Sequence, residues 1–229
     1  MGSEDNFHKR KARSTSDLKR VKAFRKQNKR ILIICEGSKT EFNYFRDLRT
    51  DLGIDPKQVN IPKNDGNTPD RILDHALALY DEDALSGDAY DKVYCVFDRD
   101  THSTFDESVQ RIESLKSGRK PKPFEAITST PCFEFWLLLH FGYTDAAFHQ
   151  AGKKSVGDNA VAALKKKPGF AAYDKGTQGI YKQLKPKLPD AIKHAQKLRE
   201  ESIKNRTMNP ATNVNILVLD IQALSSSNK

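Results

Sequence analysis

The chain of 229 residues has few cysteines and no long apolar run, and each shortage excludes a class of protein. Its three cysteines, Cys35, Cys95 and Cys132, lack the paired spacing of a thiolate metal site or a redox motif. No stretch approaches the roughly 18 apolar residues that a membrane span requires, and the N-terminus lacks the hydrophobic core of a secretion signal. We therefore expect a cytoplasmic protein with reduced, buried cysteines and no membrane partner.

Positive charge is concentrated at the start of the chain. Residues 1–30 hold eleven lysines and arginines against three acidic residues, which gives them +8 of the chain's total net charge of +9. So basic a segment, with few apolar residues, is expected to be a mobile or only partly helical tail over residues 1–29. It suits the phosphate backbone of nucleic acid, but also an acidic partner or a role in solubility. Residues 30–229 are then long enough for a single α/β domain.

An acidic residue stands where an apolar strand ends in residues 30–41 (RILIICEGSKTE). The unbroken apolar run 31–35 predicts a strand that is buried on both faces of a parallel sheet. Glu36 then lies beyond the carboxyl end of that strand, where ligands bind in open α/β sheets. Taken alone, Glu36 is explained equally well as an exposed loop carboxylate.

The residues after Glu36 predict a turn and a helix. Gly37 permits a tight turn, and Ser38 with Glu41 has the spacing of a capping box, so a helix is expected over residues 41–52. We interpret Glu41 as a capping residue, because that role explains it without a ligand.

Residues 92–100 (KVYCVFDRD) contain a second apolar run, which ends in two aspartates. If the strand continues, its alternation places Asp98 and Asp100 on one side and Arg99 on the other. Two carboxylates held together repel each other, and the usual relief is a cation, with Mg²⁺ the natural candidate. Aspartates also commonly begin loops or cap helices, so the pair alone is weak evidence for a metal site. Glu36, at the end of another strand, makes the combination more specific.

A third carboxylate position lies in residues 129–142 (STPCFEFWLLLHFG). Thr130 as N-cap and Pro131 at the first position predict a helix, apolar enough to be buried nearly all round. Glu134 is conspicuous there, because an unpaired buried carboxylate is costly. It is a credible metal ligand, or else the partner of one of the many lysines and arginines. His140 is expected to be a core histidine.

The remaining pattern alternates strands with helices, which is typical of a doubly wound sheet. The fold class is therefore α/β, with a mostly parallel sheet flanked by helices, followed by a lysine-rich helical extension. Further helices are predicted over 68–81, 105–117 and an insertion at about 152–206, strands over 58–61 and 124–128, and a strand or buried helix over 214–219.

The glutamate-glycine turn and the later strand ending in Asp-x-Asp resemble the Toprim fold of topoisomerases, primases and overcoming-lysogenization-defect nucleases. Four segments, ILIICEGSKTEFNYF, VFDRD, STPCFEFWLLLHF and NPATNVNILV, together resemble the RloB family of bacterial Toprim-like proteins, from Ile31 to about Val218. The resemblance implies a Toprim-like (Rossmann-like) domain over residues 30–229. It also implies a Mg²⁺- or Mn²⁺-dependent nuclease of anti-phage defence, acting on RNA or DNA and often encoded beside an ATPase.

Phosphodiester hydrolysis by metal ions also needs groups that move protons and stabilise negative charge. The metal ligands expected on this basis are Glu36, Asp98, Asp100 and Glu134, and the expected catalytic groups are Glu36, Lys39, His102 and Lys175. Two other functions stay open: a nucleic-acid or partner-binding module with a degenerate site, and a Mg²⁺-dependent phosphohydrolase of small nucleotides. The oligomeric state is not indicated by the sequence.

Overall fold

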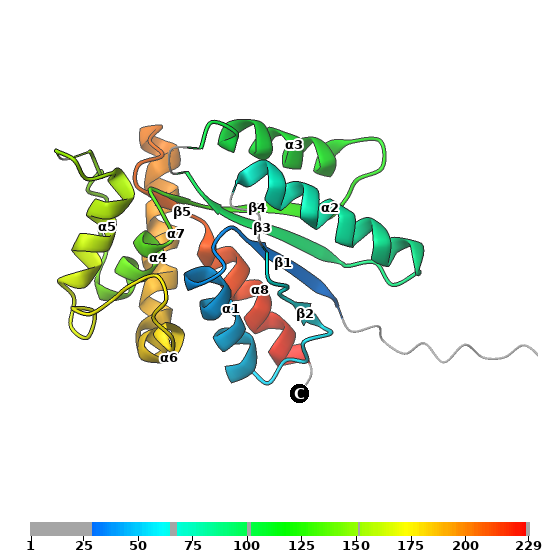
Figure 1. Cartoon of the computed structure of the whole chain (residues 1–229), viewed down its shortest axis with the longest axis horizontal. Coiled ribbons are helices and arrows are strands. Elements are labelled where there is room, and N and C mark those ends of the chain that lie inside the picture. Colours follow the sequence, from blue (N-terminus) through cyan, green and yellow to red (C-terminus); the bar gives the residue numbers. More distant parts are fainter. Residues whose placement is uncertain (1–28, 65–67, 100–101, 151, 228–229) are drawn as a thin grey trace, which may run out of the picture.

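The computed structural model describes residues 29–64, 68–99, 102–150 and 152–227. Nearly all of the predicted basic tail and the predicted ligand Asp100 therefore lie outside the described residues. At the centre is a five-stranded sheet of order β2-β1-β3-β4-β5, parallel except for the edge strand β5 (Figure 1). This is the Rossmann-like α/β fold that the sequence predicts. The strands are β1 (Ile31–Cys35), β2 (Val59–Asn60), β3 (Lys92–Asp98), β4 (Phe124–Thr130) and β5 (Ala211–Thr212).

Helices cover both faces of the sheet, as Figure 1 shows. Alternate residues of β1 point to opposite faces, so Ile31 and Ile33 join one apolar cluster while Leu32 and Ile34 join another. Because both clusters exclude water, the strand reads as an unbroken apolar run in the sequence. The first face is covered by α1 (Thr40–Asp51) and α8 (Val214–Ser227), the second by α2 (Pro69–Leu85) and α3 (Phe105–Ser117).

A further group of helices packs beside the sheet, at the left of Figure 1. Its centre is the fully buried segment around Trp136, whose ring contacts the rings of Tyr44 and His140 edge to face. The lysine-rich segment predicted to be helical forms much of this layer, and β5 then returns the chain to the sheet. The elements are α4 (Glu134–Leu138), η2 (Leu139–Phe141), α5 (Val156–Lys165), α6 (Ile180–Leu184), η3 (Lys185–Lys187) and α7 (Leu188–Asn205).

Most predicted elements are confirmed, with small differences at their ends. The helix predicted over 105–117 is α3, α2 begins at Pro69 after Thr68 as expected, and only two residues of the predicted strand 58–61 pair as β2. The ambiguous last segment 214–219 is the start of helix α8. Within the described residues, no helix is both long enough and apolar enough to cross a membrane.

The helix predicted to begin at Pro131 is wrong at its start. Ser129 and Thr130 pair with Thr212 and Ala211 of β5, and this pairing extends β4 through the residue predicted as an N-cap. Helix α4 begins only at Glu134. The prediction failed because the pairing partner lies in a distant part of the chain, after α7, where local spacing gives no sign of it.

The strand order reverses between β1 and β3. From β1 the chain passes to β2 on one side, and then returns to β3 on the other side. In open α/β sheets the crevice outside the carboxyl ends of two such strands is where ligands bind. Glu36 follows β1 and Asp98 ends β3, so both predicted acidic residues lie at this reversal.

Candidate functional site

Four carboxylates line one pocket of about 410 Å³ beyond the ends of β1 and β3. They come from separate places in the fold: the turn after β1, the end of β3 and the first turns of α1 and α4. Three of the four were expected there from the sequence, and Glu41 was not. The pocket is lined by Glu36, Glu41, Asp98 and Glu134, with Lys39, His102 and Lys175 and the connecting Gly37, Ser38 and Thr40.

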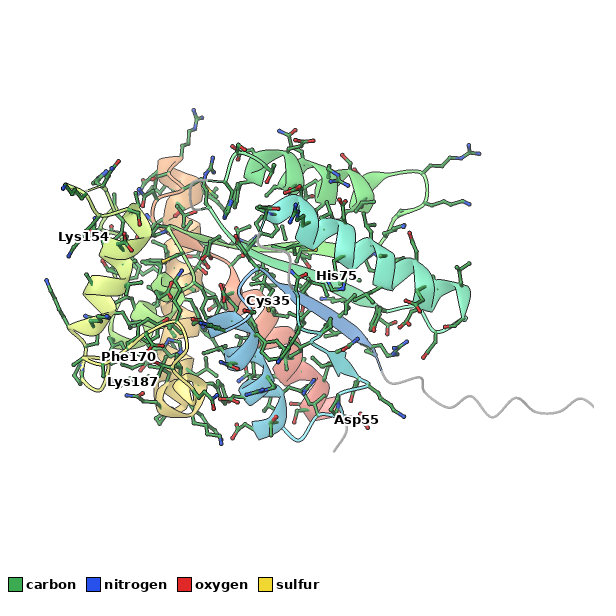
Figure 2. All side chains as sticks on the ribbon, viewed as in Figure 1. Cys35, Asp55, His75, Lys154, Phe170 and Lys187 are labelled. Atoms are coloured by element: carbon green, nitrogen blue, oxygen red, sulfur yellow. The ribbon has the colours of Figure 1, made fainter. Side chains whose placement is uncertain are left out.

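Glu36 is held by its neighbours on β3. Its backbone N–H donates to the carbonyl of Val96 (2.9 Å), so the ladder between β1 and β3 continues into the turn. Its Oε2 accepts a hydrogen bond from the backbone N–H of Asp98 (2.9 Å), while its Oε1 lies 2.8 Å from His102 Nε2. The side chain is therefore fixed over the end of β3, with the His102 ring against its second oxygen. Cys35, labelled in Figure 2, marks the adjoining end of β1.

Asp98 is fixed from the opposite side. Its backbone pairs with Ser129 of β4, and its Oδ2 accepts a hydrogen bond from the N–H of Phe133 (3.1 Å). Burial, followed by the negative charges of Glu41, Glu134 and Glu36, raises the pKa of Asp98 well above its usual range, and the Phe133 bond only partly opposes this. The protein thus holds a carboxylate where its charged form is disfavoured.

Glu41 does not cap the helix, so that prediction is wrong. Helix α1 begins at Thr40 after Lys39, and its N-cap makes no side-chain hydrogen bond. Glu41 instead turns into the pocket, 8% exposed, where burial first and then Glu134 and Glu36 raise its pKa to about 7. Its carboxylate covers Gly37 so closely that a Cβ there would lie 1.9 Å from Oε2. A larger residue at position 37 would displace the Glu41 carboxylate from this place, so the glycine is the sequence signal that the capping interpretation missed.

Glu134 is only 2% exposed, at the first residue of α4. Its Oε1 accepts a hydrogen bond of 2.7 Å from the hydroxyl of Tyr173, which also lies 3.4 Å from the hydroxyl of Thr40. The Thr40 hydroxyl donates to the carbonyl of Lys175 (2.9 Å). Sequence reasoning missed Tyr173 and Thr40, although a buried tyrosine requires a polar partner for its hydroxyl.

Lys175 is the cation most closely tied to the four carboxylates. Burial lowers its pKa, but the charges of Glu134, Cys132, Glu41 and Asp98 outweigh that effect, so the pKa of Lys175 is raised. The turn that carries it is fixed, because Asp174 Oδ1 accepts a hydrogen bond from the N–H of Gly176 (2.6 Å). Lys39 also lines the pocket, and like Lys175 it is an exposed residue.

The donors in this pocket suit a hard divalent cation. They are carboxylate oxygens, which Mg²⁺ and Mn²⁺ prefer, and burial followed by the neighbouring carboxylates raises the pKa of Asp98 and of Glu41, so that their charged forms are disfavoured without a counter-ion. Among the residues that the structure describes, no three histidine, cysteine, aspartate or glutamate side chains are arranged so that they could hold a metal ion as they stand. The carboxylates that would have to draw together around an ion are Glu36, Glu41, Asp98 and Glu134.

The pocket lies within a segment shared with a known protein family. The model of the RloB-like protein family matches residues 31–221, from the first residue of β1 into helix α8. No curated protein and no solved structure matches the chain. The match takes in all of the pocket's carboxylates and extends over well more than half of the sequence. The chain therefore belongs to the RloB-like protein family.

Proposed function

We propose that this protein is a Mg²⁺- or Mn²⁺-dependent nuclease of a bacterial anti-phage defence system. The family match over residues 31–221 supports the resemblance to the RloB family, and that resemblance implies the link to defence and the ATPase partner. The observation that carries the chemistry is the group of four carboxylates in one buried pocket, two of them with raised pKa values. Such crowding costs folding free energy, and a divalent cation held by these carboxylates would relieve it.

The expected ligands are Glu36, Asp98 and Glu134, together with Glu41 and with Asp100, which lies outside the described residues. A divalent ion held by these residues would supply positive charge to the phosphate and help to activate the attacking water. Tyr173 keeps Glu134 in place through its hydroxyl, and the hydrogen bonds around Asp98 and Glu36 keep these two carboxylates together.

Proton transfer is assigned to the pair of Glu36 and His102. His102 Nε2 lies 2.8 Å from Glu36 Oε1, so these residues are placed to exchange a proton between the pocket and solvent. Lys175, at the opening, offers positive charge to the oxygens of the phosphate as negative charge develops.

The test replaces Asp98 or Glu36 by its amide, in the variants Asp98→Asn and Glu36→Gln. Each keeps the shape of the side chain but removes a charge, and we expect cleavage of RNA or DNA to fall at least about a hundredfold. Cleavage by the wild type should also stop when EDTA removes divalent ions. The matched control is Asp190→Asn, on the exposed first turn of α7 and away from the pocket.

Three outcomes discriminate between the functions. Undiminished cleavage by Asp98→Asn contradicts the proposal directly. Hydrolysis of free nucleotides with no cleavage of RNA or DNA identifies a small-molecule phosphohydrolase instead. Binding of nucleic acid without any metal-dependent turnover identifies a binding module with a degenerate site.

A further inference from the structure

A second pocket, of about 550 Å³, opens beside the acidic one. The two adjoin at the end of β3, because Asp98 lines the first and the next residue, Arg99, lines the second. The Arg99 N–H donates to the carbonyl of Ser129 (2.8 Å), so the backbone is still extended there and successive side chains point to opposite sides. We call this the arginine pocket; its lining is Arg99, Thr130, Pro131, Val156, Arg206, Thr207, Met208 and Asn209.

Arg99 is oriented but keeps donors for a ligand. Its Nη2 forms an ion pair with Asp106 (3.1 Å), and its guanidinium lies 5.0 Å from the centre of the Phe105 ring. These two contacts fix the plane of the group at the start of α3. A guanidinium has five N–H donors, and the ion pair engages one nitrogen. The side chain is 40% exposed, so the other donors are accessible.

Arg206 supplies a second guanidinium from the end of α7. It is the one non-glycine residue with a positive φ (52°) in the described part of the chain. That left-handed conformation is unfavourable for a residue with a Cβ, and helices more commonly place glycine there. The chain thus keeps an arginine where glycine would be more stable, in the wall of a pocket, and such outliers concentrate at functional sites.

The chemistry of the arginine pocket is opposite to that of its neighbour. None of its described lining residues is acidic. The positive charge of the two guanidinium groups is therefore offset only by Asp106, which lies outside the lining and pairs with Arg99. Pro131, Val156 and Met208 add apolar surface, and the Met208 side chain is 58% exposed. Guanidinium groups bind phosphate in a planar, bidentate manner, and apolar side chains suit the face of a base or sugar.

We propose that the arginine pocket binds the phosphate and nucleotide that adjoin the bond cleaved in the acidic pocket. The substrate is then a polynucleotide strand that crosses the ends of β3 and β4, and a free nucleotide fills only one of the two pockets. This inference rests on the proposed nuclease function. It adds the class of substrate and two residues that hold it.

The test measures binding of a labelled single strand of about ten nucleotides by fluorescence anisotropy, in EDTA. We expect the double variant Arg99→Gln/Arg206→Gln to raise the Kd roughly tenfold. Its slope of log Kd against log salt concentration should fall by about 1.4, because each phosphate contact on a single strand contributes about 0.7. Arg206→Gly is the second variant: glycine favours the left-handed backbone, so the guanidinium is lost without strain.

The matched control is Arg119→Gln, an exposed arginine before the start of β4, at the opposite end of the sheet. It should bind the strand as the wild type does. A Kd and salt slope that do not change in the double variant overturn the inference, as does a wild type that binds the strand no more tightly than a mononucleotide. Because no metal is present, arginine-dependent binding by a chain that cleaves nothing overturns only the nuclease proposal.

Discussion

Strand β1 carries a cluster of charged residues at each end, and the two clusters differ in how their charge is balanced. Before the strand, Arg30 forms ion pairs with Asp83 and Asp88, both at 2.8 Å. Its backbone N–H donates to Asp91 Oδ2 (2.7 Å), and its guanidinium lies 4.5 Å from the centre of the Tyr90 ring. Negative charges thus surround a positive one, and the cluster ties the start of β1 to the residues before β3.

After the strand, four carboxylates share a pocket with the histidine and the two lysines that line it. There burial, and after it the negative charge of the neighbouring carboxylates, raises the pKa of Glu41 and of Asp98. Figure 2 marks the two ends with Cys35, which precedes the acidic pocket, and Asp55, which lines a pocket with Arg30. Before the strand each of the three aspartates contacts Arg30 directly, which serves the fold, whereas the buried carboxylates of the pocket are crowded against one another, which indicates an external ligand.

The largest expected effect is on stability, from replacing Arg30. Arg30→Met leaves the partly buried Asp83 and the Asp88 carboxylate without their cation, and we expect a loss of about 3 kcal/mol in the free energy of unfolding. Glu36→Gln, just beyond the other end of the same strand, should change it by no more than about 0.5 kcal/mol, since the amide oxygen still accepts from Asp98. Urea denaturation measures both.

Cleavage should show the reverse pattern. Arg30→Met should cleave at the wild-type rate below its unfolding temperature, whereas Glu36→Gln should be nearly inactive. The change at Arg30 removes charge as well as contacts, so Arg119→Met, at an exposed arginine, serves as control and should alter neither property. If Glu36→Gln destabilises the chain as much as Arg30→Met does, the two ends of β1 do not differ in the way described.

The stability of the protein should depend on pH in opposite directions for Glu41 in the pocket and His140 in the core. Burial and neighbouring carboxylates raise the pKa of Glu41 from 4.5 to about 7. The protonated Glu41 therefore contributes fully to the free energy of unfolding below pH 4.5, and this contribution is lost as the pH rises to 7. His140 acts in the opposite sense, because burial lowers its pKa from 6.5 to about 4. The contribution of neutral His140 to the free energy of unfolding is therefore lost as the pH falls from 6.5 to 4. The two effects oppose each other, and only a difference between variants isolates Glu41.

We expect Glu41→Gln to gain stability relative to the wild type by about 2 kcal/mol between about pH 5 and about pH 7, because one pKa unit corresponds to about 1.4 kcal/mol. Urea denaturation in EDTA measures the difference at each pH, and the His140 contribution cancels. Added Mg²⁺ should reduce the difference if the ion binds at Glu41. A gain that is independent of pH would show that Glu41 is ionised in the folded protein and that its charge is already balanced.

The layers of the fold were predictable because each follows from local pattern. The apolar run of β1 and the helical spacing of α2 and α3 give the same structure wherever they lie. The end of β4 was not predictable in this way, since its last residues are paired with β5 from a distant part of the sequence. The switch of 214–219 to helix is similar: a short apolar run fits a strand or a buried helix, and packing decides.

The candidate site was predictable where the strand ends place it. Glu36 and Asp98 lie together because parallel strands bring their carboxyl ends to one edge. Glu41 was missed because its spacing from Ser38 also fits a cap, and only the contact with Gly37 shows which role it has. Tyr173 was missed because the loop that carries it reaches Glu134 across the helical layer, which no local pattern reveals.

The smallest expected effect compares two tyrosines that each donate to a carboxylate. Tyr173 donates to Glu134 Oε1 (2.7 Å) in the acidic pocket, whereas Tyr181 donates to Asp51 Oδ2 (3.0 Å), a carboxylate already paired with Lys185 (2.7 Å). Tyr173→Phe and Tyr181→Phe should each lose about 1 kcal/mol of stability, the usual value for one such bond.

Only Tyr173→Phe should also slow cleavage, by roughly tenfold, because Glu134 loses the group that orients it. The dependence of cleavage on Mg²⁺ concentration distinguishes a functional role of the hydroxyl from a structural one. Tyr173→Phe should require more Mg²⁺ than the wild type for the same rate, whereas Tyr181→Phe should not. An equal effect of both variants on cleavage would mean that the hydroxyl of Tyr173 supports the fold alone. The charge balance around Asp51 and the charge excess around Glu134 would then carry no functional distinction.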